Sequence, residues 1–219
     1  IILSLAARRD YVLRITPRTV TRLEGRTVRS ILYIGIPSAF ENSLFQLGRV
    51  LVVSMISLFG TVHISANAVA NNLDAVGCIV GNAMGLAMIT VVGRCVGAQD
   101  FEQTKHYTKK LLLWDYIAQG TVNLLVLLFL NRILGMYTLS PETRALSWTL
   151  VMIHDGVAIL LWPAGFVLPN ALRAANDVRF TMVTSILSMI VWRMGLSWIL
   201  CVNMGMGAVG VWLAMVVDW

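Results

Sequence analysis

The sequence predicts an all-α fold, a polytopic bundle of membrane-spanning helices. Hydrophobic residues make up 58% of the 219 residues and charged residues only 13%, whereas about 25% of the residues in a soluble domain are charged. The apolar residues also fall into runs of about 20 or more, which is the length that an α-helix needs to cross the hydrocarbon core of a bilayer. Turn-forming residues separate these runs.

Five spans and the start of a sixth account for the chain after residue 29. We expect them at residues 30–59, 65–93, 110–131, 143–170 and 179–202, with a sixth over 207–219 that is cut short. Pro37, Pro163 and Pro169 fall within these spans and are expected to kink them. Because the chain begins at Ile1 rather than Met and ends inside an apolar run, we expect it to be part of a longer protein.

Basic residues gather in alternate loops and so predict the orientation in the membrane. On one side of the spans lie Arg8, Arg9, Arg14, Arg18, Arg22, Arg26, Arg29, Arg94, Lys105, Lys109, Lys110, Arg173 and Arg179. The loops on the other side hold only Arg132 and Arg144. Because basic loops stay in the cytoplasm, the first set is predicted to be cytoplasmic and the protein to lie in the inner (cytoplasmic) membrane. This distribution also favours lipid over nucleic acid as the partner of the basic residues.

Residues 1–29 are predicted to be the end of a preceding helix followed by a basic cytoplasmic linker. Arginines recur about every fourth residue in it, at positions 14, 18, 22 and 26. This spacing fits an amphipathic helix on the lipid surface and fits a solvated linker equally well.

Acidic residues inside the predicted spans are the main functional signal, because a carboxylate in the membrane costs several kcal/mol. Antiparallel neighbours share depth, so Arg49 is expected at the level of Asp74, and Asp155 within about one turn of Arg193. We predict a contact between Arg49 and Asp74 and interpret both arginines as candidates for structural ion pairs. Glu41 has no base at its level within its hairpin.

The presence or absence of a basic residue at the same depth ranks the acids as candidates for cation coupling. A carboxylate paired with arginine stays ionised, whereas an unpaired and desolvated one takes up a proton or binds a cation. Glu41 is therefore the first candidate, Asp155 the second and Asp74 the third. Polar residues at helical spacing next to them predict a substrate cavity, although amides also join membrane helices simply as structural contacts. The cavity candidates are Asn42, Gln46, Asn67 and Asn71.

Enzymatic chemistry is not indicated. The sequence contains no phosphate-binding glycine loop, no arrangement of a nucleophile with histidine and an acid, and no cluster with metal-ligand spacing. The three cysteines, Cys78, Cys95 and Cys201, fit neither a metal site nor a set of disulfides. We therefore expect no enzyme, no metal and no cofactor, apart from a coupling ion.

Several motifs, in this order and spacing, resemble the multidrug and toxic compound extrusion (MATE) family. They are Ile36-Pro37-Ser38-Ala39-Phe40-Glu41-Asn42, Ser65-Ala66-Asn67-Ala68-Val69-Ala70, the loop over 91–100, the segment 168–177 and Gly210-Val211-Trp212-Leu213-Ala214-Met215. The resemblance covers about residues 30–219. It implies a transporter of twelve helices in two six-helix lobes, of which this chain is the C-terminal lobe without its last helix.

The resemblance also implies a function. Such proteins exchange Na⁺ or H⁺ for cationic, amphipathic drugs by alternating access, and the N-terminal lobe of the same transporter is then the partner of this chain. An alternative within the superfamily is a flippase for lipid-linked oligosaccharides, which is expected to have several arginines facing its cavity. A membrane scaffold that does not transport is the third alternative.

Overall fold

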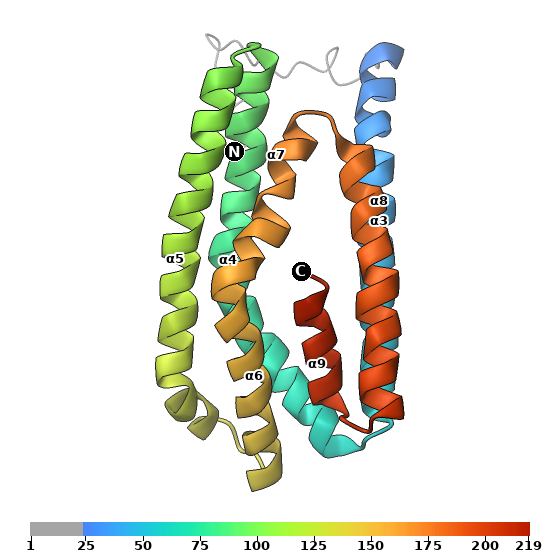
Figure 1. The fold of residues 1–219 in the computed structure, drawn as a ribbon, viewed down its shortest axis with the longest axis vertical. Coiled ribbons are helices and arrows are strands. Elements are labelled where there is room, and N and C mark those ends of the chain that lie inside the picture. The colour runs from blue at the N-terminus through green and yellow to red at the C-terminus, as the bar shows by residue number, and fades with distance from the viewer. Residues whose placement is uncertain (1–23) are drawn as a thin grey trace, which may run out of the picture.

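The protein is a bundle of long helices (Figure 1), described by a computed structural model over residues 24–219. The helices are α3 (Gly25–Ser57), α4 (Thr61–Gly97), α5 (Phe101–Gly135), α6 (Pro141–Trp162), α7 (Pro169–Ala174), α8 (Val178–Ser188) and α9 (Ala208–Val217). Three π-helical segments complete the list: η1 (Pro163–Val167), η2 (Met189–Leu196) and η3 (Ile199–Asn203). The predicted all-α fold is therefore confirmed. Most of the predicted basic linker lies outside the described residues.

Four helical stretches are long and apolar enough to cross a membrane. They are Thr61–Gly97, Phe101–Gly135, Pro141–Ala174 and Val178–Asn203. Helix α3 has 33 residues and is long enough to cross a membrane, but its polar residues make it less hydrophobic than these four stretches. Helix α9 is apolar and shorter. These helices overlap the ranges predicted from the sequence and extend several residues beyond most of them.

Local sequence explains where the helices begin and end. Asp100 caps α5 by accepting a hydrogen bond from the backbone N–H of Gln103 at 3.0 Å, and Ser140 caps α6 in the same way. Pro141 occupies the first turn of α6, where its missing N–H costs nothing. Asn176 joins α7 to α8 with a φ of 67°, a left-handed conformation that asparagine tolerates better than most residues.

The two predicted proline kinks in the fourth span correspond to a change of helix type. Pro163 begins the π-helical turn η1, in which the N–H of Leu168 donates to the carbonyl of Pro163 at 3.1 Å. Pro169 then begins α7. Because proline supplies no N–H, the regular α-helical pattern is interrupted at both positions, and a π-turn is a common result. Pro37 lies inside α3.

The helices form two groups that diverge from one end of the bundle (Figure 1). Helices α4, α5 and α6 pack closely together, and α3 packs along α8. Helix α4 crosses from the turn that it shares with α3 toward α5, so α3 and α4 separate with distance from that turn (Figure 1). Helix α9 lies between the two groups. This divergence leaves room for cavities inside the bundle.

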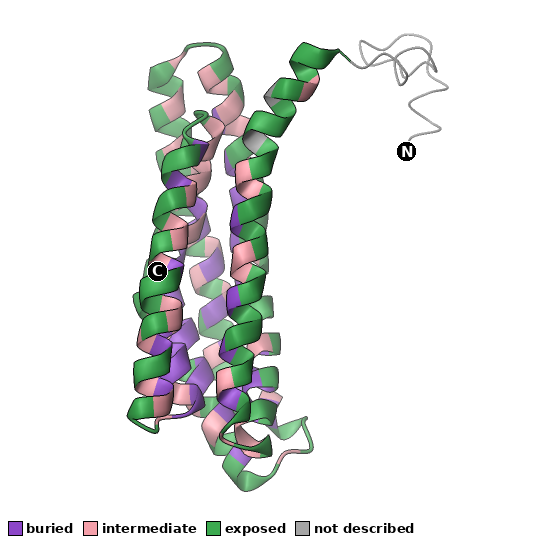
Figure 2. Ribbon diagram, turned by 90° about the vertical axis from the view of Figure 1, so that its right-hand side faces the viewer, coloured by how far each residue is buried: buried purple, intermediate pink, exposed green. Residues whose placement is uncertain are grey.

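Apolar side chains cover both the interior and the outside of the bundle. One buried cluster joins α3, α4, α5, α6 and α9 and includes Ile56, Leu130, Leu150 and Trp212. A second cluster, which includes Met88 and Trp162, joins α4 to α6 and η1. The outward faces of the helices are exposed (Figure 2) and hold many large apolar residues, as expected where lipid rather than water is the solvent.

Candidate functional site

The bundle contains a central cavity of about 240 Å³ between α3, α4, α6, η2 and α9. Its polar lining includes Gln46, Arg49, Asn67, Asn71, Asp74, His154 and Arg193. A second cavity, of about 490 Å³, lies nearer the basic end and is lined by Glu41, Asn42 and Arg173 among others. Trp162, Phe166 and Trp219 line both cavities, so the two share aromatic walls.

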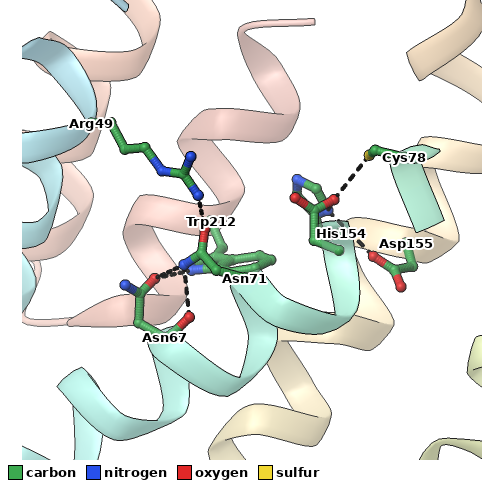
Figure 3. Close-up of polar contacts among 8 residues, drawn as sticks. Arg49, Asn67, Asn71, Cys78, His154, Asp155 and Trp212 are labelled. Atoms are coloured by element: carbon green, nitrogen blue, oxygen red, sulfur yellow. Dashed lines mark hydrogen bonds and ion pairs between the residues drawn. The ribbon is translucent and has the colours of Figure 1, made fainter. Parts of the chain in front are cut away.

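Asp74, His154 and Asp155 meet at the centre of the bundle. Nδ1 of His154 lies 3.2 Å from Oδ1 of Asp74 and 3.4 Å from Oδ1 of Asp155. His154 and Asp155 are buried, whereas the Asp74 side chain is 22% exposed, toward the central cavity. Cys78, one turn from Asp74 on α4, donates to Oδ1 of Asp74 from its Sγ at 3.2 Å (Figure 3). We call these four residues the acid–histidine cluster.

The predicted contact between Arg49 and Asp74 is wrong. Arg49 instead donates from Nη2 to Oδ1 of Asn71 at 3.0 Å (Figure 3). Both Arg49 and Asp74 line the central cavity, so they do share a depth. They do not meet because α3 and α4 diverge from their common turn, which puts the neutral Asn71 within reach of the guanidinium and Asp74 beside His154.

Asn67 and Asn71 form a network with Trp212. The amide of Asn71 donates to Oδ1 of Asn67 at 3.0 Å, and Nε1 of Trp212 donates to the same oxygen at 2.9 Å. Asn67 is buried and Asn71 faces the central cavity. Asn67 therefore lines the cavity and also joins α4 to α9 through its hydrogen bond with Trp212.

Trp212→Phe is expected to weaken this contact. The ring remains in place while the donor to Asn67 is lost, and Asn67 keeps its bond from Asn71, so the cost should be about 1 kcal/mol. Thermal unfolding in detergent measures it as a small drop in Tm. A Tm equal to that of the unaltered protein would show that the indole N–H contributes nothing to stability.

Glu41 is not the unpaired acid that the sequence predicted. Its Oε1 accepts a hydrogen bond from Nη2 of Arg173 at 2.6 Å, and the two side chains form an ion pair between α3 and α7. Glu41 is 5% exposed. Arg173 also donates to Asn170 at 2.9 Å. Glu41 and Arg173 both line the larger cavity. Because its carboxylate is paired with an arginine, Glu41 resembles a structural acid more than a free cation site.

Asp155 and Arg193 are likewise not partners. Nε of Arg193 donates to Oδ2 of Asp218 at 2.8 Å, and the guanidinium lies over the ring of Phe45. Asp218 also accepts from the hydroxyl of Ser188 at 2.8 Å. Asp218 follows α9, a segment to which the sequence analysis assigned no charge partner. Arg193 is therefore neutralised by Asp218, and among the residues that the structure describes Asp155 has only His154 as a partner.

The two remaining cavity candidates, Asn42 and Gln46, lie on α3, and each lines a cavity. Asn42 lines the larger cavity and donates to the backbone carbonyl of Ser38 at 2.8 Å. Gln46 lines the central cavity. All seven predicted coupling and cavity residues except Asp155 therefore line one of the two cavities.

The sequence analysis missed a polar column on α5. Asp115, Gln119 and Asn123 recur every fourth residue and are at most 1% exposed. Both carboxylate oxygens of Asp115 and both polar atoms of the Gln119 amide lack hydrogen-bond partners. Glycines of α4 make room for this column, since a Cβ at Gly77 would meet Asn123 and one at Gly81 would meet Gln119. The four-residue spacing of these polar residues in an apolar helix was the signal available.

These features define a polytopic helical membrane protein whose cavities are lined by charged and aromatic side chains. The family model described as MatE matches residues 37–199. The chain therefore belongs to the MatE family, and the predicted resemblance is confirmed.

Two bacterial relatives agree with this assignment. The chain is 25% identical over 211 residues to the uncharacterized transporter YisQ of Bacillus subtilis (strain 168), a match that covers 94% of this chain and 45% of the relative. It is 21% identical over 190 residues to the probable multidrug resistance protein NorM of Thermotoga maritima, covering 87% and 41%. The chain thus spans less than half the length of these relatives.

Solved structures share the fold. A crystal structure of MATE in complex with MaL6 matches with a TM-score of 0.85 and 18% identity, covering 98% of this chain and 48% of the solved chain. An outward-facing multidrug resistance MATE family transporter matches with a TM-score of 0.80 and 18% identity, over 86% and 41%. At this identity the matches establish the helical architecture of the bundle.

Proposed function

We propose that the protein exports cationic amphipathic compounds across the cytoplasmic membrane in exchange for Na⁺ or H⁺, by alternating access. The acid–histidine cluster is the observation that supports this function most strongly. It combines two carboxylates with one imidazole at the wall of the central cavity. Ionisable groups inside a membrane protein are expensive, and they typically mark the pathways of ions and substrates.

Cation coupling follows from the charge of this cluster. With both carboxylates ionised, even a protonated His154 leaves one negative charge in a medium of low dielectric constant. A proton or a sodium ion bound at Asp74 or Asp155 compensates that charge. Glu41 and Asp218 are each paired with an arginine, so among the described residues they are poorer coupling sites.

The chemistry of the cavities favours a cationic and amphipathic substrate. Trp162 and Phe166 stack with ring centroids 4.9 Å apart, and Trp219 lies edge-on to Phe166. Such aromatic faces attract organic cations and bury apolar groups. Two of the three arginines at these cavities, Arg173 and Arg193, are paired with carboxylates. The described cavities therefore lack the group of free arginines expected of a pyrophosphate-binding flippase.

A second lobe is part of this proposal. The chain covers 45% of YisQ and 41% of the Thermotoga NorM. We propose that an N-terminal lobe of the same transporter faces this bundle and that membrane lipids cover its exposed apolar surface.

Efflux from liposomes tests the function. The full-length protein is reconstituted with a fluorescent organic cation, and a sodium gradient and a pH gradient are imposed separately. One of the two gradients should drive transport, and Asp155→Asn should reduce that transport to the level of protein-free liposomes, because the amide cannot ionise.

Asp177→Asn is the matched control, since Asp177 lies in the exposed turn before α8. This variant should transport normally. Efflux at the same rate with and without each gradient would contradict coupling to Na⁺ or H⁺. Full transport by Asp155→Asn at equal protein content would show that Asp155 is not part of the mechanism.

A further inference from the structure

We propose that Asp74, His154 and Asp155 of the acid–histidine cluster form a binding site for a divalent d-block cation such as Zn²⁺. Helix α4 supplies Asp74, and helix α6 supplies His154 and Asp155. One ligand atom from each of these three residues lies within 4.8 Å of the other two. Carboxylate oxygen and imidazole nitrogen are ligands that Zn²⁺ takes in proteins. The proposal requires only the geometry of these side chains, so it holds whether or not the protein exports drugs.

The spacing of the donor atoms matches the coordination shell of such an ion. Bonds of about 2.1 Å in a tetrahedral site place neighbouring ligand atoms about 3.4 Å apart. Nδ1 of His154 lies 3.2 Å from Oδ1 of Asp74 and 3.4 Å from Oδ1 of Asp155. One ion can therefore contact donors from both helices.

A buried atom without a partner points to a missing ligand. Asp155 is 1% exposed, and its Oδ2 has no hydrogen-bond partner among the residues that the structure describes. A single N–H at Nδ1 of His154 cannot donate well to two carboxylates at once. Buried polar atoms in proteins are nearly always satisfied, so an additional group bound here is expected.

With a neutral His154, the charge of these three residues matches a divalent ion. Asp74 and Asp155 together hold two negative charges when ionised. Arg49 and Arg193 line the same cavity, but they bind Asn71 and Asp218. A divalent cation compensates both carboxylates beside a neutral imidazole, whereas a monovalent ion suffices only when His154 is protonated.

Access and rigidity complete the site. Asp74 and His154 line the central cavity, which gives an ion a route and allows water to serve as an additional ligand. The imidazole lies against the rings of Trp212 and Trp219, with centroids 4.7 and 4.5 Å away. These rings restrict the orientation of the histidine, which keeps Nδ1 directed at the carboxylates.

Metal titration tests the proposal. The full-length protein in detergent is stripped with a chelator and titrated with Zn²⁺ by calorimetry and with Co²⁺ by absorption spectroscopy. One ion per chain should bind, and Co²⁺ should show the visible bands of a tetrahedral site. Bound Zn²⁺ should also raise Tm, because a ligand of the folded state stabilises it.

Two variants make the outcome decisive. Asp155→Asn should weaken Zn²⁺ binding by more than about tenfold, since loss of even an outer-shell partner typically costs that much, and it should abolish the rise in Tm. His106→Gln, which alters an exposed histidine of α5, should change nothing. Absence of binding, equal affinity in Asp155→Asn or loss of binding in His106→Gln would overturn the site.

Discussion

Gly81→Val is expected to prevent stable packing of α4 against α5 and η1. A Cβ at Gly81 would collide with Oε1 of Gln119 and with the ring of Trp162. Both side chains are buried, and Gln119 is fully so. Overpacking of a core commonly costs about 1–3 kcal/mol, and two simultaneous collisions on different helices should place this variant at or above the upper end of that range.

The effect should appear as a loss of folded protein. Size-exclusion chromatography in detergent reports the folded fraction and thermal unfolding reports Tm, and both should fall for Gly81→Val. Gly93→Ala in the same helix is the matched control, since its Cβ would lie 4.0 Å from that of Ala174, an ordinary contact. Equal stability of the two variants would contradict the close packing of α4 against Gln119 and Trp162.

Arg173→Met is expected to destabilise the protein by leaving Glu41 buried without a partner. Glu41 is 5% exposed, and its ion pair with Arg173 has a separation of 2.6 Å. Removing one member of a buried pair costs about 3–5 kcal/mol. Arg173 is 28% exposed, so the lower end of that range applies. Tm in detergent should fall accordingly.

The double variant Glu41→Gln with Arg173→Met separates a structural pair from a functional acid. If the cost arises from the unpaired carboxylate, neutralising Glu41 should recover most of the lost Tm. The sequence analysis ranked Glu41 first as a coupling acid, whereas the ion pair predicts that Glu41→Gln lowers stability. An unchanged Tm in Glu41→Gln together with impaired efflux would support a coupling role instead.

The helices themselves were predictable because hydrophobicity and turn chemistry are local properties. The predicted ranges 65–93 and 143–170 lie inside Thr61–Gly97 and Pro141–Ala174. The predicted turn at Ser140-Pro141 is a capped helix start, and that at Asn176 is a left-handed residue. Each of these features depends on residues a few positions apart, which a single sequence displays directly.

The candidate site was only partly predictable. The sequence identified Asp74 and Asp155 as costly acids, and the structure places them on the same histidine. His154 was not among the sequence candidates, and a contact with Asp155 was not expected because adjacent residues on a helix point about 100° apart. The structure shows that Nδ1 of His154 nevertheless reaches both carboxylates, one from its own helix and one from α4.

The sequence by itself determined that this protein is a membrane bundle of the MATE type and which acids lie within its helices. Only the tertiary structure decided the partner of each acid. Glu41 contacts Arg173, which is 132 positions away, and Arg49 contacts Asn71 rather than Asp74. Composition fixes how deep a residue lies in the membrane, but an ion pair also depends on how helices cross and rotate, and those angles are set by packing between distant segments.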